Sequence, residues 1–125
     1  MAEFLSDAWL ASLEDAASEV RVPADLCLVI QQVVLQDRGH ERAFTVRIAD
    51  GTVSVEAGRA EEPDVSFTQD RATAAAIARG ELSAQAAFMA GRLRIGGDLR
   101  GVMDRARELG ALDDLFARAR ATTTW

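Results

Sequence analysis

The stretch "AFTVRIADGTVSVEAG", residues 43–58, carries the clearest structural signal of this sequence. Apolar residues alternate with polar ones on both sides of Asp50-Gly51, and the apolar set comprises Phe44, Val46, Ile48, Val53 and Val55. Alternation with a period of two is typical of a strand that buries one face. Asp-Gly between two such runs is a strong signal for a two-residue hairpin loop. The sequence therefore predicts two antiparallel strands joined at Asp50-Gly51.

Further strands are predicted on both sides of this hairpin. The run "LCLVIQQVVLQ" is rich in β-branched residues and predicts a strand over Leu26–Gln36, followed by a turn at 37–40. In "DVSFT", Val65 and Phe67 point to the same side of a strand. We therefore expect the region Leu26–Thr68 to form an antiparallel sheet with one apolar face.

Helices are predicted before and after these strands. Residues 4–20 have apolar residues at helical spacing, closed before Pro23, and these are Leu5, Trp9, Leu13, Ala16 and Val20. Asp70 can cap a helix that ends at Gly80, and Ser83 can cap another that ends at Gly91. One helix is thus expected before the first four strands and two directly after them.

The last third continues with a strand and two more helices. The run "RLRI", 92–95, alternates Leu93 and Ile95 with arginines and predicts a fifth strand of the same sheet. Gly96-Gly97 is expected to turn the chain, and Asp98 to cap a helix whose apolar stripe comprises Leu99, Val102, Met103 and Ala106. A short final helix after Gly110 would place Leu112, Leu115 and Phe116 on its apolar side.

Together these elements predict an α+β fold. We expect a five-stranded, mainly antiparallel sheet covered on one face by four to five helices. A length of 125 residues fits one domain, 1–125, with one core.

Composition excludes several classes of protein. With 49% hydrophobic and 27% charged residues the chain is typical of a soluble globular protein. Its net charge of −6, with the basic residues scattered singly, argues against nucleic acid as a partner. No apolar run approaches the roughly 18 residues of a transmembrane helix, and the first residues do not resemble a secretory leader. We expect a cytoplasmic protein, and the abundance of arginine and alanine suggests a bacterium with a GC-rich genome.

Residues with catalytic or metal-binding chemistry are sparse. The sole histidine, His40, falls in a predicted turn and is expected to be a plain surface residue, while Cys27 lies in an apolar run and is expected to be a buried, inert thiol. One histidine and one distant cysteine make no metal site. The acidic pairs Glu61-Glu62 and Asp113-Asp114 are typical of solvated charge. We therefore expect no enzyme activity, no metal and no cofactor.

The two helices predicted over 71–90 are unusually rich in alanine, with only Ile77, Phe88 and Met89 as large apolar residues. Small side chains let a helix pack closely on a sheet, which is the commoner outcome. They also leave space in which an apolar ligand can lie. Composition alone leaves both interpretations open.

The run "GELSAQAAFMAGRLRIGGDL", 80–99, resembles the sterol carrier protein type 2 family. The matching positions are Gly80, Leu82, Gln85, Ala87, Phe88, Met89, Gly91, Leu93, Ile95, Gly97 and Asp98. The order of the predicted elements also agrees with that family. The resemblance implies a non-enzymatic carrier with an apolar cavity between sheet and helices.

The resemblance further implies binding or transfer of a lipid, such as a fatty acid, acyl-CoA, isoprenoid or sterol-like molecule. The alternative is an accessory subunit that presents a lipophilic intermediate to a partner enzyme.

Gln85, Phe88 and Met89 share one helical stripe, which would join a polar group to two apolar ones if it faces the sheet. Val102 and Met103 would close over it. The predicted ligand-binding residues are Phe44, Phe67, Gln85, Phe88, Met89, Leu93, Ile95, Val102, Met103 and Phe116. Transient contact with a membrane fits the same function, whereas the oligomeric state stays open.

Overall fold

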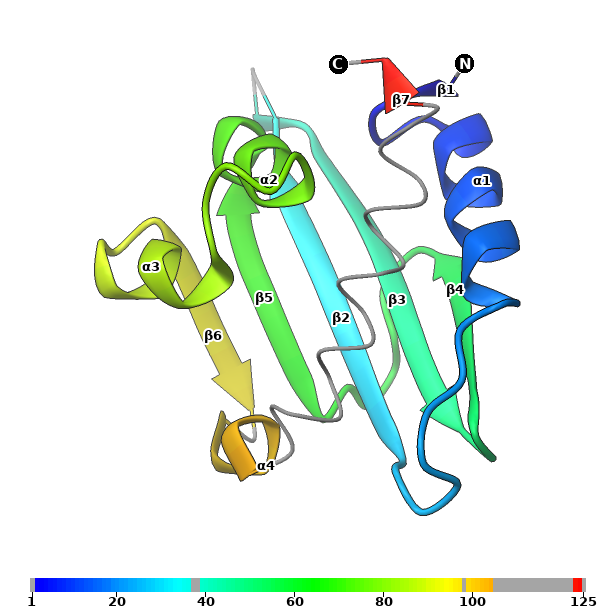
Figure 1. Ribbon diagram of the computed structural model, residues 1–125. Helices are drawn as coiled ribbons and strands as arrows, with labels where there is room; N and C mark the ends of the chain where they lie inside the picture. Colours follow the sequence, from blue (N-terminus) through cyan, green and yellow to red (C-terminus); the bar gives the residue numbers. More distant parts are fainter. Residues whose placement is uncertain (1, 37–38, 98, 105–122, 125) are drawn as a thin grey trace.

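The computed structural model describes residues 2–36, 39–97, 99–104 and 123–124. Within them the chain forms four helices, a five-stranded sheet and a pair of short terminal strands (Figure 1). The elements in chain order are β1 (Ala2–Glu3), α1 (Asp7–Ala17), β2 (Leu28–Leu35), β3 (Glu41–Ala49), β4 (Thr52–Ala57), β5 (Val65–Asp70), α2 (Arg71–Ala78), α3 (Ala84–Met89), β6 (Leu93–Gly97), α4 (Leu99–Asp104) and β7 (Thr123–Thr124). The α+β class is therefore as predicted.

The predicted hairpin is confirmed. β3 and β4 pair antiparallel with Ala49 opposite Thr52, so the loop consists of Asp50 and Gly51 alone. Both residues have positive φ, 54° and 77°, as the two-residue loop that matches the twist of a hairpin requires. β2 likewise pairs antiparallel with β3, with Leu35 opposite Glu41.

The prediction that Leu26–Thr68 is wholly antiparallel is wrong, because β5 runs parallel to β2. The strand order is β4-β3-β2-β5-β6, and the three pairings other than β2–β5 are antiparallel. After β4, the segment 58–64 crosses the sheet on the side opposite the helices. There Thr45 Oγ1 donates to Gly58 O, and Ala60 N donates to Gln31 Oε1. β5 thus enters beside β2 from the same end, which a local alternation pattern cannot reveal.

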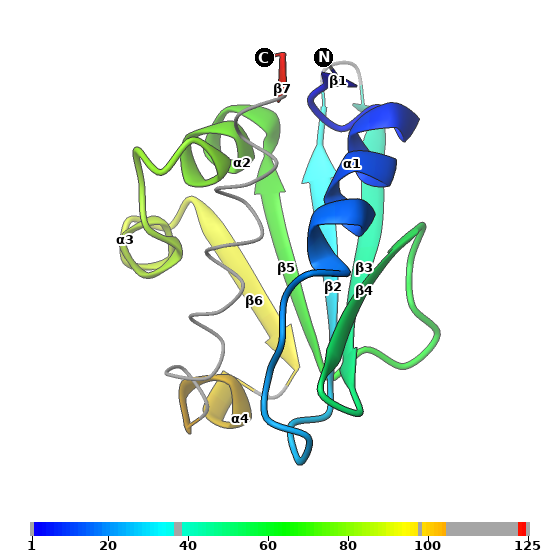
Figure 2. The same ribbon diagram turned by 45° about the vertical axis from the view of Figure 1, so that its right-hand side comes forward.

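Helices α1, α2 and α3 lie on one face of the sheet, α1 over β4 and β3, and α2 and α3 toward β5 and β6 (Figures 1 and 2). The predicted caps of the last two are confirmed, because Asp70 accepts from Thr73 N and Ser83 accepts from Ala86 N. Gly80 and Gly91 follow these helices with φ of 79° and 75°, as expected of helix-ending glycines.

The first helix is shorter than the predicted 4–20. Leu5 has a φ of 68°, which no helix accommodates, and Ser6 then caps α1 by accepting from Trp9 N. Leu5 and Val20 are nevertheless buried, although both lie outside the helix. Apolar spacing therefore marked Leu5, Trp9, Leu13 and Val20 correctly as buried, but it chose Ala16, which is partly buried, in place of Leu10 and Ala17, and it gave the wrong helix limits.

The ends of two strands also differ from the prediction. β2 spans Leu28–Leu35, shorter at both ends than the expected Leu26–Gln36. Gly96 and Gly97 do not form a turn but end β6, where Gly97 pairs with Val65. The cap at Asp98 and the final helix with Phe116 lie outside the described residues.

The core lies between α1, α2 and the helix-facing side of the sheet. Phe4, Trp9 and Phe44 form a series of edge-to-face contacts, with ring centroids 5.0 and 5.6 Å apart. Trp9 Nε1 also donates to Thr123 Oγ1 at 3.2 Å, next to the parallel pair of β1 and β7 that was not predicted. No helix among the described residues is long and apolar enough to cross a bilayer.

Candidate functional site

The candidate site is the helix-facing side of the sheet where it passes from β3 to β6. Residues directly opposite one another on neighbouring strands point to the same face of a sheet. The register places five such residues in one row, namely Ala57, Phe44, Gln32, Phe67 and Ile95. The row has one residue on each of the five strands, which lie about 4.8 Å apart, and it therefore crosses the whole sheet. Its middle is a candidate floor for an apolar ligand.

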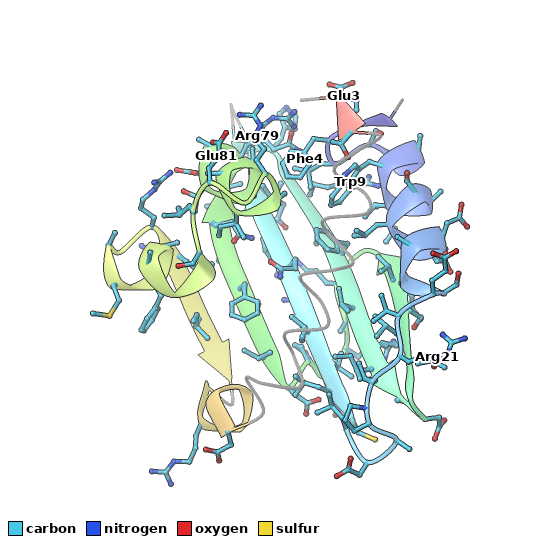
Figure 3. The ribbon with its side chains drawn as sticks, in the orientation of Figure 1. Glu3, Phe4, Trp9, Arg21, Arg79 and Glu81 are labelled. Atoms are coloured by element: carbon cyan, nitrogen blue, oxygen red, sulfur yellow. The ribbon has the colours of Figure 1, made fainter. Side chains whose placement is uncertain are left out.

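The two ends of this row are covered differently. Over β3 and β4, helix α1 buries large side chains, including Trp9, Leu10 and Leu13. Figure 3 shows Phe4 and Trp9 next to each other above the sheet, between α2 and α1. Phe44 is only 4% exposed beneath them. This end of the face is filled by packed core.

Toward β5 and β6 the described cover consists of small side chains. The buried residues of α2 are Thr73, Ala74 and Ala78, and Ala87 is buried among the residues of α3 whose side chains the structure describes. On β5 and β6, Phe67 and Ile95 are only partly buried although both are large and apolar. This part of the face thus combines large, partly buried side chains on the sheet with small buried side chains on the helices, an arrangement that suits an apolar ligand.

The predicted ligand-binding residues fall into three groups. Phe44, Phe67, Leu93 and Ile95 all point to the helix-facing side of the sheet. Gln85, Val102 and Met103 lie on α3 and α4, but their side chains are outside what the structure describes, as is the whole of Phe116.

The third group, Phe88 and Met89, corrects the expected orientation of α3. Their exposed fractions are 41% and 78%, whereas Ala87 is fully buried. α3 has only six residues and follows a capped turn, so its contact with β6 fixes which side faces inward. That contact turns Ala87 to the interior, and Phe88 and Met89 therefore do not face the sheet.

Two polar residues on the same face were not predicted. Gln32 and Gln69 lie among apolar neighbours, and Gln69 Nε2 donates to Gln32 Oε1 at 2.9 Å. Gln69 is buried and Gln32 is partly buried. The alternation of β2 carries the signal that was missed, because Gln32 shares its parity with Leu28, Ile30 and Val34.

Charged groups lie around this face rather than in its middle. Arg42 pairs with Asp7, Arg92 Nε donates to Thr73 Oγ1 at 3.2 Å, and the Arg71 guanidinium lies 5.4 Å from the ring centroid of Phe4. Hydrogen bonds from the Thr73 backbone and side chain lower the pKa of Asp70, with a smaller contribution from Arg92. The bonds of Asp70 and Arg92 hold α2 beside β5 and β6, whereas Arg42 joins β3 to α1. The five residues of the row carry no charge.

Residues with nucleophilic or metal-binding chemistry are elsewhere. His40 is exposed, as predicted, but the expectation of a buried Cys27 is wrong. Cys27 precedes β2 and points away from the side on which its neighbours Leu26 and Leu28 are buried. Among the described residues, no three His, Cys, Asp or Glu side chains come together in a way that could hold a metal ion.

The chain is similar to several solved structures. A conserved hypothetical protein from Thermus thermophilus, described as possibly a sterol carrier protein, is 20% identical with a TM-score of 0.77, covering 100% of this chain and 93% of its own. A crystal structure of sterol carrier protein 2 is 20% identical with a TM-score of 0.71, covering 94% and 98%. Palmitated sterol carrier protein 2-like 2 from Aedes aegypti is 18% identical with a TM-score of 0.57, covering 82% and 89%. These likenesses establish the fold.

A comparison with curated proteins gave no match. The model of the SCP-2 sterol transfer family, in contrast, matches residues 26–107, which include the sheet from β2 to β6 with α2, α3 and α4. Lipid binding or transfer is the general role to which this family points. The resemblance seen in residues 80–99 is thereby confirmed, and the chain belongs to the SCP-2 sterol transfer family.

Proposed function

We propose that this protein binds a lipid on the helix-facing side of β2, β5 and β6 and carries it without changing it chemically. The observation that carries the proposal is the contrast along one sheet face. Trp9 fills the β3 end, whereas Phe67 and Ile95 on β5 and β6 are only partly buried and the buried residues of α2 are small. The palmitated relative supports a long-chain ligand, because it combines the same fold with an acyl chain.

The expected affinity follows from the apolar surface that an acyl chain would bury. About ten methylenes at about 0.8 kcal/mol each supply roughly 8 kcal/mol. Losses of translational and conformational freedom offset part of this gain. We therefore expect an environment-sensitive fatty-acid probe to bind saturably, with a Kd in the micromolar range.

Ile95→Trp tests where the lipid lies. If a ligand occupies the space above Ile95, the indole should fill that space, weaken probe binding at least about tenfold and lower the free energy of unfolding by less than about 1 kcal/mol. Probe titration and chemical denaturation of the ligand-free protein measure the two effects.

Ile48→Trp is the matched control, because Ile48 is on the same face but fully packed near α1. There the larger side chain should destabilise the protein by about 1–3 kcal/mol, while the folded fraction still binds the probe. Strong destabilisation by Ile95→Trp, or full retention of binding, would show that the lipid does not lie over β6. A wild-type protein that binds no fatty acid, acyl-CoA or isoprenoid probe would contradict the carrier function itself.

The accessory role is the second candidate, favoured by the exposure of Phe88 and Met89 on α3. Two apolar side chains in solvent offer a contact for a partner enzyme. Native mass spectrometry with organic extraction separates the two roles. A carrier retains lipid in near-stoichiometric amount, whereas an accessory subunit gains affinity for the lipophilic intermediate only with its partner present.

A further inference from the structure

Three large apolar side chains are exposed in the described part of the chain, and two of them are neighbours on α3. These two are Phe88 and Met89, and the third is Leu35 at the end of β2. Single exposed apolar residues are common on protein surfaces, whereas adjacent ones with a polar surround are typical of an interaction site. The pair on α3 therefore marks a candidate docking surface.

The charges near this pair differ from those of the rest of the protein. Residues 71–100 contain five arginines and two acidic residues, so the net charge of −6 comes from the remainder of the chain. Arg92 follows α3 directly, and Arg94 lies on β6, the edge strand against which α3 packs. Both arginines are exposed. The apolar pair thus lies in the basic part of an acidic protein.

The first helix presents the opposite character. Figures 1 and 2 show α3 outside β6 at one edge of the molecule and α1 over β3 and β4 at the other. The large apolar residues of α1 are buried, and its exposed positions include Asp7, Glu14 and Asp15. A negatively charged partner would be repelled by α1 and attracted to the edge at α3.

Leu35 lacks the basic setting of the α3 pair. It stands opposite Glu41 on β3 and opposite Asp70 on β5. Its neighbours on both adjacent strands are therefore acidic, whereas the residues that follow Phe88 and Met89 include two arginines. Only the α3 pair combines exposed apolar side chains with positive charge among the described residues.

We infer that the α3 edge, defined by Phe88, Met89, Arg92 and Arg94, docks on a lipid bilayer with anionic headgroups. Apolar side chains that enter the boundary between headgroups and acyl chains, together with basic residues, are the usual composition of a membrane-docking surface. Arg94 alternates with Leu93 and Ile95 and so points to the face of β6 opposite the helices. The bilayer is therefore expected to lie along the β6 edge, where both sides of this strand approach it.

Docking at this edge goes beyond the proposed function, because it requires no lipid inside the protein. It also fits that function. α3 packs against β6, and Ile95 of β6 belongs to the proposed lipid site. A bilayer at this edge would therefore lie next to the β6 end of that site.

Flotation of the full-length protein with large unilamellar vesicles tests the inference. Vesicles of equal parts phosphatidylcholine and phosphatidylglycerol should bind the protein at least about tenfold more tightly than phosphatidylcholine vesicles at low ionic strength. About 1 M salt, which shortens the Debye length to about 3 Å, should remove most of this gain. The net charge of −6 alone predicts repulsion. Equal or weaker binding to the anionic vesicles would overturn the inference.

Variants of exposed residues identify the surface. The double variant Phe88→Ser/Met89→Ser should weaken vesicle binding at least about tenfold, and Arg94→Glu at least about fivefold. Leu35→Ser and Arg47→Glu are the matched controls. Arg47 is exposed on the same sheet face as Arg94, but on β3, so its reversal changes the net charge equally. Both controls should keep vesicle binding, and test variants that behave like them would overturn the choice of the α3 edge.

A fluorescent label reports directly which residue enters the bilayer. Met89→Cys in a Cys27→Ser background carries one environment-sensitive nitrobenzoxadiazole group, whose emission should shift to the blue on anionic vesicles. Leu35→Cys in the same background is the control and should show no shift. The absence of a shift at position 89, or an equal shift at both positions, would contradict docking through α3.

The fatty-acid probe separates this inference from the proposed function. Phe88→Ser/Met89→Ser should bind the probe like the wild type, because Phe88 and Met89 do not face the sheet. Ile95→Trp should lose the probe and still float with vesicles. A wild type that binds the probe but no anionic vesicle would overturn bilayer docking and leave α3 as a contact for a partner protein. Light scattering without vesicles detects a second copy, and a dimer that the double variant dissociates would likewise overturn it.

Discussion

Single residues decide how closely β5 and β6 approach each other. Gly97 pairs with Val65 at the end of β6 and has a φ of 90°, which side chains other than hydrogen rarely accept. A Cβ built on it would lie 2.4 Å from Asp64 O, a backbone atom. Asp64 in turn accepts from Val29 N through its side chain and cannot move freely. Gly97 was predicted to form a turn, but the close backbone contact is the reason that glycine is required at this position.

Gly97→Ala should consequently lower the free energy of unfolding by about 1–3 kcal/mol, as expected for a strained backbone combined with a steric clash. Chemical denaturation measures the change. Gly96→Ala is the control, because nothing lies within 4 Å of its Cβ position and its φ is not positive. Equal stability of the two variants would show that the backbone at Gly97 relaxes without cost.

At the scale of the element, a cap determines how α2 leaves the sheet. Asp70 ends β5 and accepts from Thr73 N at 2.7 Å, which begins α2 directly over that strand. These bonds favour the charged carboxylate, and they lower the pKa of Asp70. α2 then presents its buried alanines to the sheet, so the position of the cap also positions the cover of the candidate site.

Asp70→Ala should destabilise the protein by about 1 kcal/mol at neutral pH through loss of the cap. Because the pKa of Asp70 is lower in the folded state, its contribution is complete above the unfolded value of about 3.9 and disappears as the pH falls through the folded value. The stability difference between wild type and Asp70→Ala should thus shrink at acidic pH. Asp70→Asn, which keeps an accepting oxygen, should be the milder change at neutral pH. A difference independent of pH would mean that the carboxylate charge does not contribute.

At the scale of the whole molecule, the two ends of the chain meet at Trp9. Its indole packs between Phe4 and Phe44 and donates to Thr123, while β1 pairs with β7 beside it. This contact covers the β3 end of the sheet face with packed core. The lipid site that we propose therefore lies toward the other end, at Phe67 and Ile95.

Thr123→Val should remove the acceptor and leave the buried Trp9 N–H without this bond, at a cost of about 1–3 kcal/mol. In a Trp9→Phe background, which has no N–H to satisfy, the same change should cost clearly less. Denaturation of the four proteins of this cycle yields the coupling free energy. Additive effects would show that the hydrogen bond does not join the two ends energetically. Probe binding should persist in Thr123→Val, because the bond lies away from β5 and β6.

The sequence by itself determined the features that depend on neighbours along the chain. Alternation placed Phe67, Leu93 and Ile95 on strands of one apolar face, and Asp50-Gly51, Asp70 and Ser83 identified a hairpin and two helix starts. Each of these signals arises from local backbone preference or from a period that burial of one face imposes.

Only the tertiary structure decided what depends on contacts between distant segments. It made β5 the parallel neighbour of β2, exposed Cys27 and turned Ala87 of α3 inward in place of Phe88 and Met89. It also joined Gln32 to Gln69, 37 residues apart. Neighbouring strands and facing side chains are chosen by packing over the whole molecule, and a short helix or a single residue carries too few local restraints to fix that choice.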